Sequence, residues 1–159
     1  MARILTRLML RRTREQRQRN GVDESRLEAH YFEQHLGPFW EQIRMRLKAE
    51  VEGYNRRAKA QGRGTIAISL EPDGGAFSAS KEEPPAGSVT VGAGGSTGRG
   101  LYLAYYELGT RSERRSYPSG DEFTLQGTKD GIVVLRPGGL VPPDRLVMLI
   151  LEPFFEMVT

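Results

Sequence analysis

A long apolar stripe in the first half of the sequence constrains the fold most strongly. Its side chains recur at steps of three or four residues, which places them on one face of an α-helix. They are Leu36, Trp40, Ile43, Leu47, Val51, Tyr54 and Ala58. Strands follow in the sequence and need cover, so we expect this helix to pack on a sheet. The alternative is a coiled-coil seam against a second helix.

Charged residues between the stripe positions are predicted to form the solvated face of the same helix. They are Glu41, Arg44, Arg46, Lys48, Glu50 and Glu52. Gly62 and Gly64 are expected to end the helix. Residues 22–36 are predicted as a separate helix, because Asn20-Gly21 is typical of a helix stop and Gly37-Pro38 of a break or a restart.

Beyond Gly64 the apolar period changes to two, which is typical of β-strands. Predicted strands cover residues 65–71, a short segment around Phe77 and Ala79, and residues 88–92, 101–108, 122–127 and 132–136. Residues 81–87 and 109–120 are predicted loops. Asp130-Gly131 marks the turn of the last hairpin, because both residues tolerate the positive φ that such turns require.

A final helix is predicted to begin at Pro142-Pro143-Asp144. It is apolar nearly all round, so we expect it to be buried on more than one side. Pro153 is expected to kink or shorten it. Helices and strands that do not alternate favour an α+β fold. We predict a two-layer sandwich: N-terminal helices, about five or six antiparallel strands, and a C-terminal helix packed on the sheet.

Positive charge is concentrated at the N-terminus. The first twenty residues hold seven arginines and one glutamate, a net charge of +6 in a chain of net +3, which leaves −3 for the remainder. We predict a basic amphipathic tail over residues 1–21 and a single α+β domain over residues 22–159. Ile4, Leu5, Leu8 and Met9 are predicted to form the apolar face of that tail.

The side-chain inventory argues against catalysis. The chain has no cysteine, which excludes thiol nucleophiles and thiolate metal sites. Its two histidines, His30 and His35, are separated so that one helix face cannot present both to a metal. The glycine-rich run at 92–100 lacks the Lys and Ser/Thr of a phosphate loop, although Arg99 beside it offers an anion contact. We predict a cytoplasmic protein that is not an enzyme and has no cofactor.

Three binding hypotheses follow. The first is a non-catalytic protein-interaction domain that self-associates, with an interface including Trp40, Leu47, Leu149, Phe154 and Phe155. The second is nucleic-acid binding through the Arg-rich N-terminal tail, to which the strand bearing Tyr102, Tyr105 and Tyr106 could add aromatic stacking. The third is attachment of the tail to an anionic membrane surface. The candidate anion or nucleic-acid contacts are Arg3, Arg7, Arg11, Arg12, Arg14, Arg111, Arg114 and Arg115.

Overall fold

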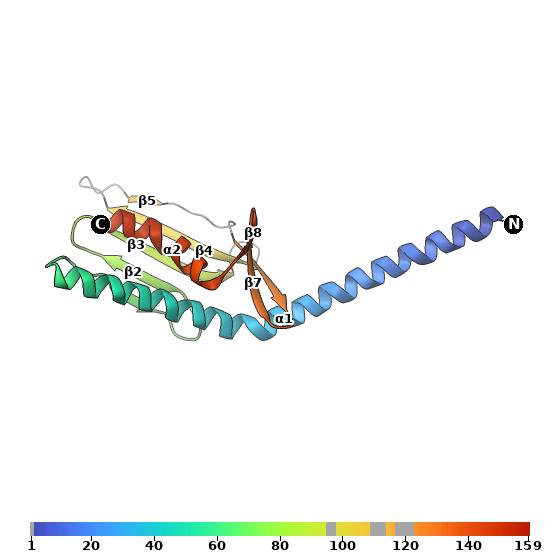
Figure 1. The fold of residues 1–159 in the computed structure, drawn as a ribbon, viewed down its shortest axis with the longest axis horizontal. Helices are drawn as coiled ribbons and strands as arrows, with labels where there is room; N and C mark the ends of the chain where they lie inside the picture. The colour runs from blue at the N-terminus through green and yellow to red at the C-terminus, as the bar shows by residue number, and fades with distance from the viewer. Residues whose placement is uncertain (1, 95–97, 109–113, 117–122) are drawn as a thin grey trace.

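The computed structural model describes residues 2–94, 98–108, 114–116 and 123–159, of which residues 2–12, 108 and 114–116 are described as backbone only. The chain begins and ends with a helix, and all the strands lie between these two helices in the sequence (Figure 1). The elements are α1 (Ala2–Ala60), β1 (Ala67–Leu70), β2 (Phe77–Lys81), β3 (Ala86–Gly94), β4 (Gly100–Leu108), β5 (Arg114–Ser116), β6 (Thr124–Thr128), β7 (Gly131–Arg136), β8 (Gly139–Val141) and α2 (Pro143–Val158).

The strands form one eight-stranded antiparallel sheet. Its order is β1-β2-β3-β4-β6-β7-β8, and β5 pairs separately with β4. The junction between β4 and β6 is a single pair, Gly100 with Thr124. Beyond it, β6 and β7 form a hairpin that lies against α1 (Figure 1).

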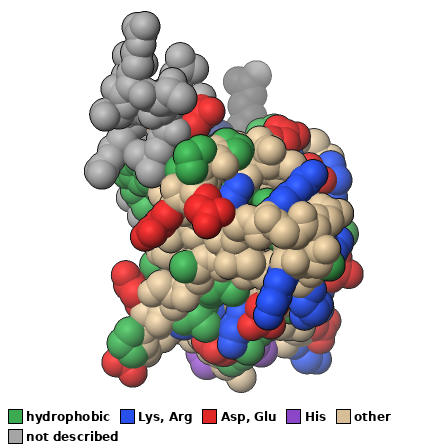
Figure 2. Space-filling model, turned by 90° about the vertical axis from the view of Figure 1, so that its left-hand side faces the viewer, with side chains coloured by type: hydrophobic (Ala, Val, Ile, Leu, Met, Phe, Trp, Pro, Cys, Tyr) green, Lys and Arg blue, Asp and Glu red, His purple; other side chains and the backbone are tan. Residues whose placement is uncertain are grey.

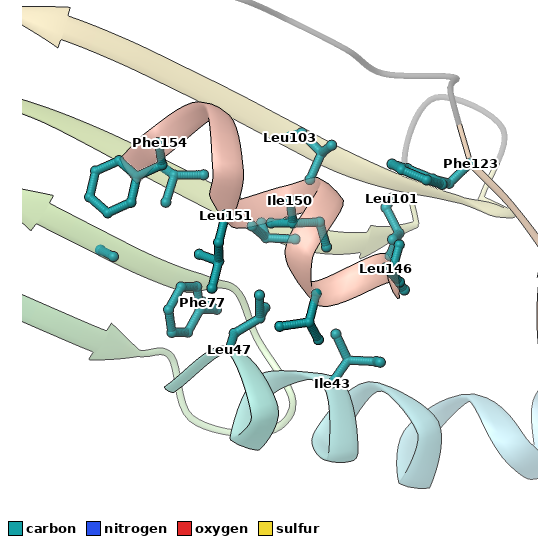
Figure 3. Close-up of a cluster of buried hydrophobic side chains, with 14 of the residues drawn as sticks. Ile43, Leu47, Phe77, Leu101, Leu103, Phe123, Leu146, Ile150, Leu151 and Phe154 are labelled. Carbon is teal, nitrogen blue, oxygen red and sulfur yellow. The ribbon is translucent and has the colours of Figure 1, made fainter. Parts of the chain in front are cut away.

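One face of the sheet is covered by both helices. Buried strand residues such as Phe77, Leu101 and Leu103 form one cluster with Ile43 and Leu47 of α1 and with α2 (Figure 3). From α2 the cluster takes Leu146, Ile150, Leu151 and Phe154. This confirms the predicted α+β sandwich, in which helices from opposite ends of the chain share one sheet face. The sheet has more strands than expected, because β5 and β8 are only three residues each and carry no clear alternation.

The predicted helix boundaries in the first sixty residues are wrong. α1 is a single helix that continues through Gly21, Gly37 and Pro38. Proline in a helix interior removes a hydrogen bond and costs about 3 kcal/mol. Phe32, Phe39 and Trp40, on both sides of Pro38, are buried in the core, and their burial holds the helix together across this position. The predicted effect of Pro153 is also wrong in one respect: α2 is not shortened and runs on to Val158, with Phe154 and Val158 fully buried.

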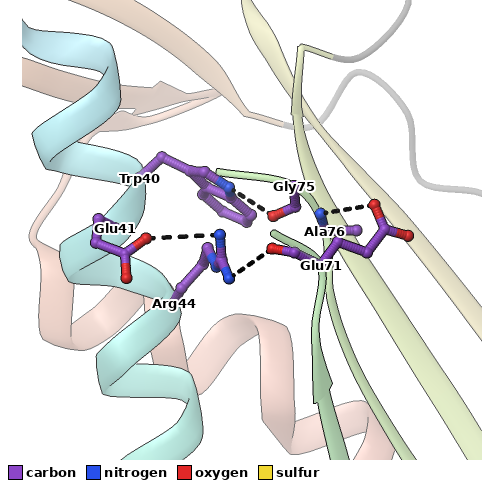
Figure 4. Close-up of polar contacts among 6 residues, drawn as sticks. All are labelled: Trp40, Glu41, Arg44, Glu71, Gly75 and Ala76. Atoms are coloured by element: carbon purple, nitrogen blue, oxygen red, sulfur yellow. Dashed lines mark hydrogen bonds and ion pairs between the residues drawn. The ribbon is translucent and has the colours of Figure 1, made fainter. Parts of the chain in front are cut away.

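The prediction that Arg44 lies on the solvated face of the helix is also wrong, because only 5% of this residue is exposed. The turn between β1 and β2 folds over it (Figure 4). Arg44 Nη2 donates to the carbonyl oxygen of Glu71 at 2.9 Å, and Nη1 lies 3.5 Å from Glu41 Oε2. Trp40 Nε1 donates to the carbonyl oxygen of Gly75 at 3.1 Å. Two side chains of α1 therefore hold this turn in place.

The other end of β1 is held by Asn55 of α1. Its Nδ2 donates to the carbonyl oxygen of Ile66 at 2.8 Å, and its Oδ1 accepts from the Ile66 N–H at 2.7 Å. One amide side chain thus pairs with both backbone groups of the residue preceding β1, as a neighbouring strand would.

Candidate functional site: the N-terminal arm of α1

The first part of α1 extends beyond the folded body. We call residues 2–27 the arm and the remaining residues the body. Figure 1 shows the arm running straight out from the body as a single helix. Every side chain from residue 13 to residue 27 is exposed, including Val22 at 51% and Leu27 at 52%. At about 1.5 Å per residue the arm is about 39 Å long.

The arm begins where α1 leaves β6. A β-carbon at Gly127 would lie 2.2 Å from the backbone nitrogen of Phe32 and 2.6 Å from the carbonyl oxygen of Glu28. Strand and helix backbones are therefore in direct contact, which only a glycine permits. We call this contact, with the side chains of Glu28, Phe32 and Arg99, the anchor.

Polar groups surround the anchor. Glu28 Oε1 accepts from Arg99 Nη1 at 2.6 Å and from the Gly127 N–H at 2.8 Å. The guanidinium carbon of Arg99 lies 3.9 Å from the centre of the Phe32 ring, within the range of a cation–π interaction. Arg99, a candidate anion contact beside the glycine run, is therefore part of the anchor, where its guanidinium is paired with the Glu28 carboxylate. Residues 95–97 of that run lie outside the described residues.

The candidate basic contacts divide between two places. Arg3, Arg7, Arg11 and Arg12 belong to the arm as backbone positions of α1, and Arg14 is exposed on it. Arg114 and Arg115 belong to β5, opposite Leu108 and Glu107 of β4. Figure 1 places β5 on the body, away from the arm, so the structure does not bring the two groups together. Arg111 lies outside the described residues.

The candidate interface residues lie inside the chain. Trp40, Leu47 and Phe154 are buried in its own core, while Leu149 and Phe155 are half-buried against it. Tyr54 stacks on Phe155 with ring centres 5.1 Å apart. The apolar surface that suggested a partner for these helices is thus covered by the sheet and by the helices themselves.

The tyrosine-bearing strand β4 alternates as predicted. Tyr102 is 46% exposed on the uncovered face of the sheet, and Tyr106 on the same face is half-buried. Tyr105 points into the core, where its hydroxyl donates to the carbonyl oxygen of Ile150 at 2.6 Å. Only Tyr102 of the three presents a substantial surface to solvent.

The sequence reasoning missed the anchor. Its one visible signal is Gly127, a glycine in the middle of a strand, which often marks a close approach of another backbone. Among the described residues no group of three acidic, histidine or cysteine side chains is placed to hold a metal ion. Within the same residues no helix is long and apolar enough to cross a membrane. Comparisons with protein-family models, curated proteins and solved structures find no significant match.

Proposed function

We propose that this chain is a non-catalytic interaction protein whose arm binds a partner with an acidic surface, and that a second copy of the chain is such a partner. The observation that carries the proposal is the arm itself, a helix whose described side chains are all exposed from residue 13 to residue 27. The sequence has no cysteine and only two histidines, so it offers few of the side chains that most often act in acid–base catalysis. This supports a role without catalysis.

An unsupported helix of this kind is marginally stable in water, because most helical stability in proteins comes from packing. Gly21 lowers the stability of the helical arm by about a further 1 kcal/mol relative to alanine. Contact with a partner along the arm supplies the stabilisation that the body does not provide. Val22 and Leu27 offer apolar surface for that contact, next to the exposed Arg19 and Arg26.

Charge favours contact between the arm of one copy and the body of another. The first twenty residues carry +6 and the rest of the chain carries −3. Two arms side by side repel each other, whereas an arm against an acidic body is attracted to it. Because this attraction acts between solvent-exposed charges, high salt weakens it.

Nucleic acid is the second candidate partner. All seven basic residues among the first twenty are arginines, and the guanidinium group binds phosphate with two parallel hydrogen bonds. Such binding loses affinity steeply as salt rises, roughly in proportion to the number of phosphates neutralised.

Light scattering coupled to size exclusion separates these possibilities. The full chain and a chain beginning at Val22 are compared at low and high salt, with and without a labelled duplex oligonucleotide. We expect the full chain to associate at low salt and the shortened chain to remain monomeric. Co-elution of a monomeric full chain with the duplex would favour nucleic acid instead. Equal association of both chains at both salt concentrations would overturn the proposal, because it would assign binding to the body.

A further inference from the structure

The opposite end of α1 carries a second concentration of positive charge. Residues 55–63 contain Arg56, Arg57, Lys59 and Arg63 and no acidic residue, a net charge of +4. We call this segment the basic end. The first twenty residues and the basic end together carry +10 in a chain of net +3, so the rest carries −7. Figure 2 looks onto this end of the molecule and shows Lys and Arg side chains gathered on one side of it.

Helix capping explains only part of this cluster. Arg57 and Lys59 lie in the last turn of α1, where cations are favoured by the partial negative charge of the helix C-terminus. That charge is equivalent to about half an elementary charge, so it does not neutralise four cations. None of the four basic side chains has an ion pair or hydrogen bond with any part of the chain that the structure describes. The four cations are therefore unpaired among the described residues, and the nearest carboxylate that the structure places by the segment is Glu83, beside Gly64.

The end of the helix brings Arg63 back beside Arg57. Gly62 has a φ of 68°, and its N–H donates to the carbonyl oxygen of Lys59 at 3.1 Å. The Arg63 N–H donates to the carbonyl oxygen of Ala58 at 2.8 Å. These two bonds form a Schellman motif, which turns the chain back over the last helical turn. The motif therefore fixes the backbone position of Arg63 beside the last turn of α1.

Between these side chains is a pocket of about 120 Å³. It is lined by Tyr54, Arg57, Ala58, Gln61 and Arg63. The Tyr54 ring is held in place by its stacking on Phe155. One side of the pocket is thus rigid, and the other sides are formed by the flexible side chains of Arg57, Gln61 and Arg63.

A third guanidinium lies close by. Arg57 Nη1 and Arg56 Nη2 reach within 3.5 and 3.6 Å of the position that a β-carbon of Gly53 would occupy. Both guanidinium groups therefore lie over the same part of the α1 surface, around Gly53. Like charges held near one another on a surface repel weakly in water, and an anion bound beside them relieves that repulsion.

We propose that the pocket at the basic end binds a phosphate group, with Arg57 and Arg63 as its guanidinium ligands and Gln61 as an amide donor. At about 120 Å³ the pocket is larger than one water molecule and has room for one tetrahedral oxyanion. It is far smaller than the roughly 300 Å³ or more of pockets that enclose whole small molecules. The recognised chemistry is therefore the phosphate group alone, free or at the end of a phosphomonoester.

The test is an amide NMR titration of the full chain with inorganic phosphate, and separately with AMP, at constant ionic strength set by chloride. We expect saturable shifts at Ala58 and at residues 61–63. In the double variant R57Q/R63Q the affinity is expected to fall by about tenfold or more, because charge-assisted hydrogen bonds are lost. The matched control is R145Q, which removes an exposed arginine of α2 outside the cluster. It is expected to titrate like the natural chain.

Binding of both probes with similar affinity assigns recognition to the phosphate group alone, whereas binding of inorganic phosphate only restricts the ligand to the free ion. Shifts that do not saturate, or that persist unchanged in R57Q/R63Q, would overturn the proposal by showing charge screening only. Because both arginines are exposed, we expect the variant to fold. An amide spectrum that otherwise matches that of the natural chain then shows that a loss of binding is not a loss of folding. The result does not depend on the proposed function of the arm, because the arm amides give signals separate from those of Ala58 and residues 61–63.

Discussion

Replacing Gly127 with alanine tests the contact on which the position of the arm depends. The new methyl group would lie 2.2 Å from the Phe32 nitrogen and 2.7 Å from the Phe32 α-carbon. Both are backbone atoms of a helix, so no side-chain rotation relieves the overlap. Either β6 or α1 must move by about 1 Å to restore ordinary contact, and overpacking of this kind costs about 1–3 kcal/mol.

The same movement stretches the bond from the Gly127 N–H to Glu28 Oε1, now 2.8 Å long. A hydrogen bond to a charged acceptor contributes about 1.5–3 kcal/mol. Alanine also lowers the conformational entropy of the unfolded chain, which offsets about 0.4–1 kcal/mol of the lost stability. With the bond weakened and not abolished, we expect G127A to lower the free energy of unfolding by about 2–4 kcal/mol.

The matched control is G92A in β3. A β-carbon at Gly92 meets nothing within 4 Å, so we expect a change of about 0.5 kcal/mol or less, or a slight stabilisation. Urea denaturation of both variants and the natural chain, followed by circular dichroism, gives the comparison. Equal stability of G127A and G92A would refute the reasoning, because it would mean that helix and strand do not touch at this point.

Three further substitutions test the packing of the body by the same denaturation assay. N55A removes both bonds to Ile66 and is expected to cost about 2 kcal/mol, since the Ile66 backbone groups lose their partner; N55A as stable as the natural chain would disprove the pairing. F154A opens a cavity in the core, where Phe154 is fully buried, and is expected to cost about 3–5 kcal/mol; the control M45A, at a position 47% exposed, is expected to change stability by about 0.5 kcal/mol or less. W40F retains most of the buried ring but loses the bond to Gly75, with an expected cost of about 1–2 kcal/mol; a larger loss than in F154A would contradict this ranking.

Periodicity was sufficient to predict the two layers. The stripe from Leu36 to Ala58 and the alternation that follows it identify which faces are buried, and burial of those faces dictates a helix-on-sheet sandwich. The start of α2 at Pro143 also follows from local preference, since proline is favoured at the first helical turn.

Features set by distant contacts could not be predicted. Pro38 and Gly37 favour a helix break locally, and only the burial of Phe39 and Trp40 by strands far along the chain overrides that preference. The helical pattern alone predicts that Arg44 faces solvent. It is buried because the turn at Glu71, which is distant in sequence, folds over it. The anchor joins Glu28, Arg99 and Gly127, which no periodic pattern connects.

Hydrogen exchange of the arm amides tests the central claim most directly. The full chain is measured in dilute solution, at high concentration in low salt, and with the duplex oligonucleotide, and exchange is followed for residues 2–27 against the core of α1. The account predicts fast exchange of the arm in the dilute chain and slower exchange when a second copy or the duplex is present, with high salt abolishing the difference. Exchange that is equally fast under all these conditions would contradict a binding role for the arm. Protection of the arm already in the dilute chain would contradict its being free of the body.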